Sequence, residues 1–141
     1  MYIAFLLFLA CTIGRIQKHS LEEGVQLQKV AYVGSQIGVE KNFKLHVNRL
    51  LRQEGWYGKT PIILELVTVQ ESWQTSLMWG LEVEVVVVYQ DRKSPIIRYR
   101  AMERIQYMGN FVEIRQEAYQ KMYHAITQRV FHWVYVQGKG S

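Results

Sequence analysis

Apolar residues recur with the period of a helix in two segments of the chain. In the first segment a stripe at i, i+4, i+7 and i+8 is formed by Phe43, Val47, Leu50 and Leu51. Lysine, arginine and asparagine occupy the opposite side of this stripe, and Gly55 stands where a helix commonly ends. The pattern therefore predicts a helix from about Val39 to Gln53.

The second helical pattern lies near the end of the sequence. Asn110 is followed three residues later by Glu113, the spacing of a capping box in which the Asn side chain accepts from the third helical N–H. We expect a long helix that ends near Tyr135 or Val136, with residues 138–141 outside it. Its continuous apolar stripe would consist of Ile114, Ala118, Met122, Ala125, Ile126, Val130, Trp133 and Val134.

The segment between the two helices is rich in β-forming residues. It predicts three strands, with a turn region at Ser72–Thr75 and a polar hairpin tip at Gln90–Pro95; the strands are Ile62–Val69, Leu77–Tyr89 and Ile96–Tyr107. A shorter run, Gln26–Val33, predicts one more strand before the first helix. The order strand, helix, three strands, helix predicts an α+β two-layer sandwich, with a four-stranded, mostly antiparallel sheet and both helices on one face.

The hairpin gives a hypothesis about the two faces of this sheet. If Gln90 faces Ser94 across a three-residue tip, Glu84 lies opposite Arg100. Because side chains alternate along a strand, odd positions from Val83 to Ala101 would form an apolar face against the helices. The even positions would form an open, charged face, made of Glu82, Glu84, Arg98, Arg100 and Arg104.

The sequence starts with an apolar run that closes on Leu9-Ala10-Cys11, and Cys11 is the chain's one cysteine. The run is about half as long as a membrane-spanning helix and has the length of a signal-peptide core. We interpret residues 1–10 as a lipoprotein signal peptide, Cys11 as the acylated residue, residues 11–24 as a tether and residues 25–141 as one domain. The alternative is that residues 1–13 form a buried element and Cys11 is a core thiol.

Composition and candidate chemistry narrow the functional classes. The net charge of +5 suggests an acidic partner, although a charge of this size also simply solubilises a domain. The four histidines are scattered, and Glu82 and Glu84 are better placed to pair with Arg98 and Arg100 than to act as an acid–base couple. We therefore expect no enzyme, no metal site and no cofactor. The candidate ligand- or partner-binding residues are Arg92 and Lys93 at the tip and Arg98, Arg100 and Arg104 on the even face.

A resemblance to a known family rests on the order of these elements. They include an acylatable Cys11, the helix end at Leu50–Gly55, the strand from Ile97 to Met102 and the closing helix Glu113–Val134. In this order the chain resembles the LptE family of lipopolysaccharide-assembly lipoproteins. YajG-type envelope lipoproteins are nearly as similar. The first resemblance implies a non-enzymatic lipoprotein on the periplasmic side of the outer membrane. Such a protein would plug or scaffold a β-barrel translocon and meet lipopolysaccharide or another anionic glycolipid. The alternatives are an envelope lipoprotein of a secretion or motility complex and a basic nucleic-acid-binding module. We expect no nucleic acid as partner, because the even face lacks the aromatic residues of a single-strand platform.

Overall fold

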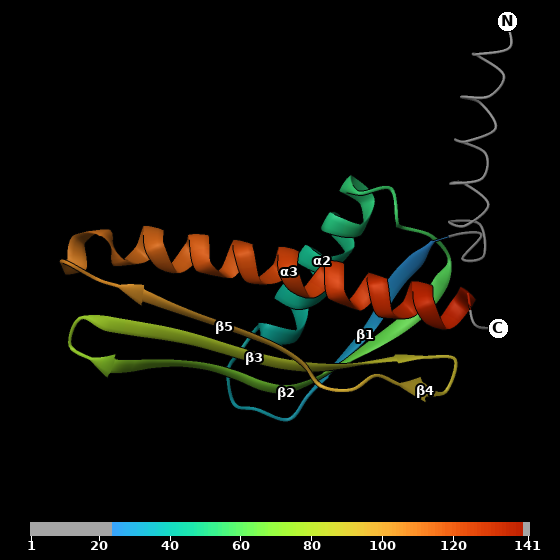
Figure 1. Cartoon of the computed structure of the whole chain (residues 1–141), viewed down its shortest axis with the longest axis horizontal. Helices are drawn as coiled ribbons and strands as arrows, with labels where there is room; N and C mark the ends of the chain where they lie inside the picture. The colour runs from blue at the N-terminus through green and yellow to red at the C-terminus, as the bar shows by residue number, and fades with distance from the viewer. Residues whose placement is uncertain (1–23, 140–141) are drawn as a thin grey trace, which may run out of the picture.

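The computed structural model describes residues 24–139, which build two layers (Figure 1). The elements in chain order are β1 (Val25–Tyr32), α2 (Val39–Gln53), β2 (Thr60–Thr75), β3 (Met78–Tyr89), β4 (Arg92–Lys93), β5 (Ile97–Arg104), the 3-10 helix η1 (Met108–Asn110) and α3 (Phe111–Lys139). The predicted signal peptide, Cys11 and residues 11–23 of the predicted tether lie outside the described residues. No helix among residues 24–139 is both long and apolar enough to span a bilayer.

The strands form one mixed sheet in the order β1-β2-β3, and both β4 and β5 pair with the remaining edge of β3. β1 is parallel to β2 because α2 carries the chain back between them, whereas the other pairings are antiparallel. Both helices cover the same face, and α3 runs along the whole length of the long strands (Figure 1). This arrangement confirms the predicted α+β two-layer sandwich, with the two-residue β4 as an additional strand.

The helix α2 has the bounds that its apolar stripe predicts, Val39–Gln53. Its end is a Schellman motif, in which the N–H of Trp56 donates to the carbonyl of Leu51 at 2.8 Å and the N–H of Gly55 donates to that of Arg52 at 3.1 Å. Gly55 has a φ of +73°, a conformation that costs glycine little. The prediction that Gly55 closes this helix is therefore confirmed.

The predicted turn at Ser72–Thr75 is wrong, because β2 continues through it. Ser72 pairs with Gly80 and Trp73 with Trp79, so the ladder extends to Thr75 and Met78. The Trp73 ring also packs on Phe111 of the helix layer, 5.1 Å between centroids. Packing and ladder bonds override the turn preference of this polar segment, and the turn falls instead at residues 76–77.

The predicted register is wrong by three residues at the hairpin tip and by two residues between β3 and β5. Tyr89 pairs with Arg92 across a two-residue tip, Gln90–Asp91, whose φ angles of +49° and +64° are those of a type I′ turn. After a bulge around Ser94, Glu84 faces Arg98 and Glu82 faces Arg100, rather than Glu84 facing Arg100. Because a shift of two preserves the alternation of side chains, the assignment of the residues of β3 and β5 to the two faces still holds.

The predicted capping box at Asn110 is also wrong. Asn110 belongs to η1, which leads directly into α3, whereas an N-cap residue has a non-helical backbone. Its Oδ1 is buried and accepts no hydrogen bond. The helix itself runs on to Lys139, beyond the predicted end at Tyr135 or Val136.

The core lies between the sheet and the two helices. Met122 and Ile126, in the middle of the α3 stripe, are fully buried, and so are Phe43, Val47 and Leu51 of α2. On the sheet side, odd residues of β3 from Trp79 to Tyr89 are buried, while its even residues from Glu82 to Val88 are half-buried. The helices thus cover the apolar face, as predicted, and leave the even face to solvent.

Candidate binding surface on the open sheet face

The open face carries a row of cations along one side of the sheet. Arg98, Arg100 and Arg104 all lie exposed on β5. Lys93 joins them from β4, because it pairs with Val88 of the same face and bonds Glu65 of β2. Arg92 does not belong to this row, because its side chain turns to the helix layer, where Nη1 donates to Oε1 of Gln137 on α3 at 3.3 Å. The structure therefore brings four of the five candidate residues onto one surface.

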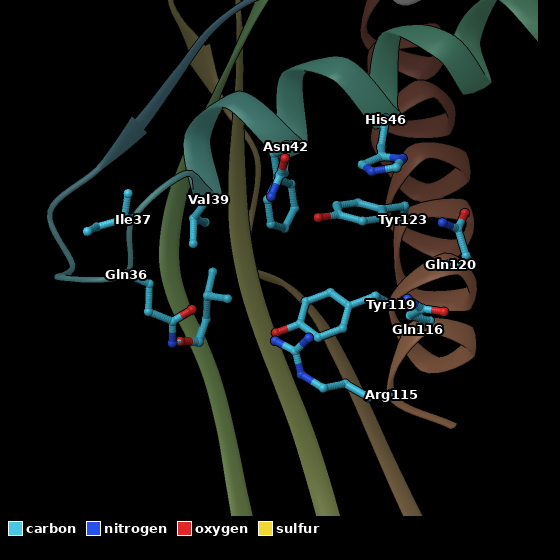
Figure 2. A pocket seen from close by; sticks show the side chains of 12 residues that line it. Gln36, Ile37, Val39, Asn42, His46, Arg115, Gln116, Tyr119, Gln120 and Tyr123 are labelled. Carbon is cyan, nitrogen blue, oxygen red and sulfur yellow. Dashed lines mark hydrogen bonds between the residues drawn. The ribbon is translucent and has the colours of Figure 1, made fainter. Parts of the chain in front are cut away.

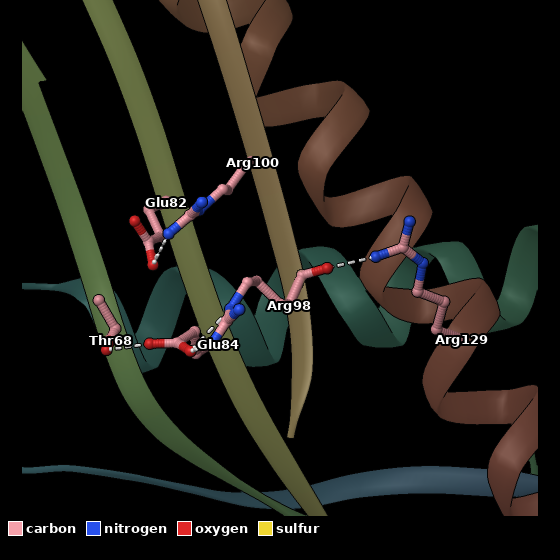
Figure 3. A network of polar contacts seen from close by, with 6 residues as sticks. All are labelled: Thr68, Glu82, Glu84, Arg98, Arg100 and Arg129. Carbon is pink, nitrogen blue, oxygen red and sulfur yellow. Dashed lines mark hydrogen bonds and ion pairs between the residues drawn. The ribbon is translucent and has the colours of Figure 1, made fainter. Parts of the chain in front are cut away.

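Each of the two central arginines is held by a glutamate of β3 (Figure 3). Nε and Nη2 of Arg98 donate to Oε2 of Glu84 at 2.9 and 2.7 Å, and Nη2 of Arg100 donates to Oε1 of Glu82 at 3.3 Å. The hydroxyl of Thr68 on β2 donates to Oε1 of Glu84 at 2.8 Å. The hydrogen bonds from Thr68 and Arg98 hold the pKa of Glu84 below its ordinary value.

The charges of this row nearly balance, while the exposed Lys29 of β1 adds a further cation to the same face. The ammonium of Lys93 lies 2.9 Å from Glu65, so three of the four cations pair with carboxylates. Arg104 has no ion-pair partner among residues 24–139. An anion that bound here would compete with Glu82 and Glu84 for their arginines, whereas Arg104 is free to meet a new negative charge.

The same face is hollowed at Gly80. The hollow encloses about 370 Å³ because β3 has no side chain at that position, and the Sδ of Met102 leans over it. Polar side chains line it, together with the Glu82–Arg100 pair; they are Gln70, Ser72 and Gln74. Amides, a hydroxyl and an ion pair around a backbone floor offer hydrogen bonds to a polar ligand.

A second hollow lies on the helix face, between the start of α2 and the first half of α3 (Figure 2). It encloses about 320 Å³ and is lined by amides and aromatic rings, among them Asn42, Gln116, Gln120, Tyr119 and Tyr123. The imidazole of His46 stacks on the Tyr123 ring at 4.4 Å between centroids. Burial, together with the charge of Arg49, lowers the pKa of His46 below its ordinary value.

Two residues that line this hollow, Arg115 and Tyr119, bind a third side chain, Glu71, and so join α3 to β2. Arg115 donates two hydrogen bonds to the carboxylate of Glu71, from Nε at 2.7 Å and from Nη2 at 2.6 Å. The hydroxyl of Tyr119 donates to Oε2 of Glu71 at 2.6 Å. Burial acts to raise the pKa of Glu71, but these bonds outweigh it and hold the pKa below its ordinary value. Burial and the adjacent carboxylate raise the pKa of Tyr119.

Sequence reasoning missed this cluster. Arg115 and Tyr119 are one helical turn apart, a spacing that places them on one side of α3. The signal was incomplete because Glu71 lies in the part of β2 that the sequence assigned to a connection. Among residues 24–139, no three His, Cys, Asp or Glu side chains gather as potential metal ligands.

The fold recurs in solved structures of low sequence identity. A protein of the DUF330 family from Xanthomonas campestris has a TM-score of 0.56 at 9% identity, with 84% of this chain and 86% of that chain covered. A putative lipoprotein from Caulobacter crescentus has a TM-score of 0.55 at 7% identity, covering 88% and 93%. A hypothetical protein from Chlamydia trachomatis has a TM-score of 0.51 at 10% identity, covering 85% and 100%. No family model and no curated protein matches the sequence. The chain therefore shares its fold with these proteins, one of which is a putative lipoprotein.

Proposed function

We propose that this protein is a lipoprotein of the bacterial cell envelope, attached through Cys11 to the periplasmic side of the outer membrane. The observation that carries the proposal is the apolar run ending in Leu9-Ala10-Cys11, which precedes a fold similar to that of a putative lipoprotein. An acylated cysteine provides more than one lipid chain, enough for stable attachment.

Within the envelope, we propose that the domain scaffolds or plugs a β-barrel translocon of lipopolysaccharide assembly. The open sheet face supports a protein partner, because its nearly balanced row of ion pairs resembles the polar part of a protein–protein interface. Arg104 and the loosely held Arg100 are the cations best placed to meet a phosphate of the glycolipid, since the 3.3 Å contact between Arg100 and Glu82 is the longer of the two arginine pairs.

The first experiment tests the lipid. Cells that express the full chain are labelled with a palmitate analogue, and the Cys11→Ala variant is the matched control. We expect label on the wild-type chain alone and a mature protein that begins at Cys11 with a diacylglyceryl addition in mass spectrometry. A membrane-bound chain that retains Met1 would refute the lipoprotein.

The second experiment tests the translocon. The tagged chain is purified from detergent-solubilised outer membranes, and its partners are identified by mass spectrometry. A stoichiometric β-barrel partner is the expected result. A lipidated chain that co-purifies instead with components of a secretion or motility machine would favour the generic envelope lipoprotein, for which the row of ion pairs on the open face is equally suitable.

A further inference from the structure

The two edges of the sheet differ in how their backbone groups are satisfied. At β1, Asn48 of α2 accepts from the N–H of Leu27 at 2.8 Å and donates to its carbonyl at 3.0 Å. The N–H of Val25 donates to Trp56, and the carbonyl of Val25 accepts from Gly58. At Val25 and Leu27, a side chain and a loop thus take the place of a neighbouring strand, which is one way in which natural sheets protect an edge.

The β5 edge is open over most of its length. The N–H of Ile105 donates to the carbonyl of Leu77 at 2.7 Å, so odd residues of this strand bond β3 and even residues direct their backbone groups outward. Arg129 of α3 closes one of these groups, the carbonyl of Arg98 (Figure 3). In the described part of the chain, no hydrogen bond occupies the outward groups of Arg100, Met102 and Arg104.

The open stretch has the dimensions of a strand-addition site. From Arg100 to Arg104 it extends about 14 Å at the rise of an antiparallel strand. Exposed apolar side chains accompany it, with Met102 52% exposed within the strand and Tyr107 and Met108 each 64% exposed just beyond it. Main-chain bonds would supply affinity there and the apolar side chains would supply contact area.

Charge identifies the kind of strand that fits. The exposed side chains of β5 include Arg98, Arg100 and Arg104 on a single face. An antiparallel pairing of two copies of β5 centred on Ala101 would place Arg98 opposite Arg104 of the second copy, and like charges directly opposite destabilise a sheet. A strand with acidic side chains on that face would instead meet Arg104, which has no ion-pair partner among the described residues.

We propose that the β5 edge from Arg100 to Arg104 binds an extended segment of a partner polypeptide as an added strand, with acidic residues on the side that faces the arginines. The inference goes beyond the proposed function, because it concerns the backbone of this domain and does not depend on lipid or on the identity of the barrel.

The experiment uses the full chain in detergent and a fluorescent ten-residue peptide of alternating Thr and Glu, followed by anisotropy. The matched control peptide replaces every Glu by Lys. We expect the acidic peptide to bind, the basic peptide not to bind, and the affinity of the acidic peptide to fall as salt rises. Absence of binding by the acidic peptide at millimolar concentration would overturn the proposal.

Two variants separate strand addition from general electrostatic attraction. Met102→Pro removes an outward N–H and places the proline ring where the added strand would lie, while it leaves the hydrogen bonds to β3 in place. We therefore expect at least a tenfold loss of affinity for the acidic peptide. Met102→Ala leaves the N–H in place and should lose much less. If a folded Met102→Pro variant, checked by circular dichroism, binds like wild type, the proposed edge is wrong.

Amide exchange of the wild-type chain gives a readout that does not depend on any variant folding. Strand addition slows exchange at the amides of Arg100, Met102 and Arg104 once the peptide is added, while a peptide attracted only by charge leaves these rates unchanged. The palmitate-labelling experiment can fail independently of this one. A chain that is never acylated could still show slowed amide exchange with the peptide, and an acylated chain could lack it.

Discussion

The backbone carbonyl of Trp56 lies so close to Gly24 that any side chain at Gly24 would collide with it. An ideal Cβ on Gly24 would also lie 2.7 Å from the carbonyl carbon of Tyr57, and Gly24 has a φ of +65°. Gly55 shares the positive φ, at +73°, but a Cβ there would meet no atom within 4 Å. The two glycines thus separate the cost of backbone conformation from the cost of crowding.

Gly24→Ala should destabilise the fold more than Gly55→Ala. For Gly55→Ala we expect about 1 kcal/mol, the cost of a left-handed residue with a Cβ. Gly24→Ala adds a clash with backbone atoms that cannot rotate away, so its loss should exceed that of Gly55→Ala by at least about 1 kcal/mol. Urea denaturation of the two variants measures the difference. Equal losses of unfolding free energy in the two variants would show that the backbone next to Trp56 moves aside without an energetic cost.

Removal of the Asn48 amide should destabilise the sheet edge. Asn48→Ala leaves both backbone groups of Leu27 without their partner, and we expect a loss of about 2–4 kcal/mol. Lys44→Ala, at an exposed position of the same helix, is the matched control and should change stability by less than about 0.5 kcal/mol. A similar small effect of both substitutions would contradict the role of Asn48.

Acid should weaken the junction between β2 and α3. The pKa of Glu71 is lower in the folded chain than in the unfolded chain, so its contribution is complete above the unfolded pKa and is lost as pH falls through the folded pKa. Glu71→Gln should therefore be less stable than wild type at pH 7, by about 1–3 kcal/mol. The difference should shrink between pH 5 and pH 3 in denaturation experiments. A difference that is independent of pH would mean that the carboxylate charge contributes nothing.

Charge reversal at Arg98 and Arg100 tests whether the open face binds a partner. The double variant with Glu at both positions should remain folded by circular dichroism, with a slightly lower melting temperature because each new Glu faces a Glu of β3. We expect it to lose much of its binding to the barrel or to phosphorylated glycolipid. A control variant that also replaces Glu82 and Glu84 by Arg restores the ion pairs between β3 and β5, but with the positive charges on β3 instead of β5. Wild-type binding by both variants would move the partner site away from this face.

A charge in the middle of α3 should unfold the domain. Met122→Asp buries an unpaired carboxylate at a fully buried position, and we expect a loss of about 3–5 kcal/mol or more. Lys121→Asp changes the neighbouring exposed position and should cost much less. Thermal melts of the pair give the comparison, and a wild-type melting temperature for Met122→Asp would refute the core position of this stripe.

What could be predicted from the sequence was the part of the fold that local periodicity determines. The stripe from Phe43 to Leu51 and the glycine at position 55 define α2 because both signals lie within the helix and its cap. The alternation along β3 and β5 likewise fixed which residues share a face. Arg98, Arg100 and Arg104 lie where that alternation places them.

The rest depended on contacts between distant segments. The hairpin tip was misplaced because the tip needs a positive φ at both Gln90 and Asp91; Asp tolerates this conformation, but Gln gives no signal for it. Trp73 extends β2 because it packs on Phe111, and the junction of Glu71 with Arg115 exists only once β2 and α3 meet. No window of sequence contains both partners of such contacts.

The parallel pairing of β1 with β2 has a consequence for the order of folding. β3 can pair with β2 and β5 through short connections, whereas β1 must wait until α2 and the start of β2 have been synthesised. Pairings between distant segments form more slowly because the intervening loop must first close. We therefore expect the meander to form before β1 joins it. Of the strands that the structure describes, β1 is synthesised first, and it would then be the last of them to join the sheet.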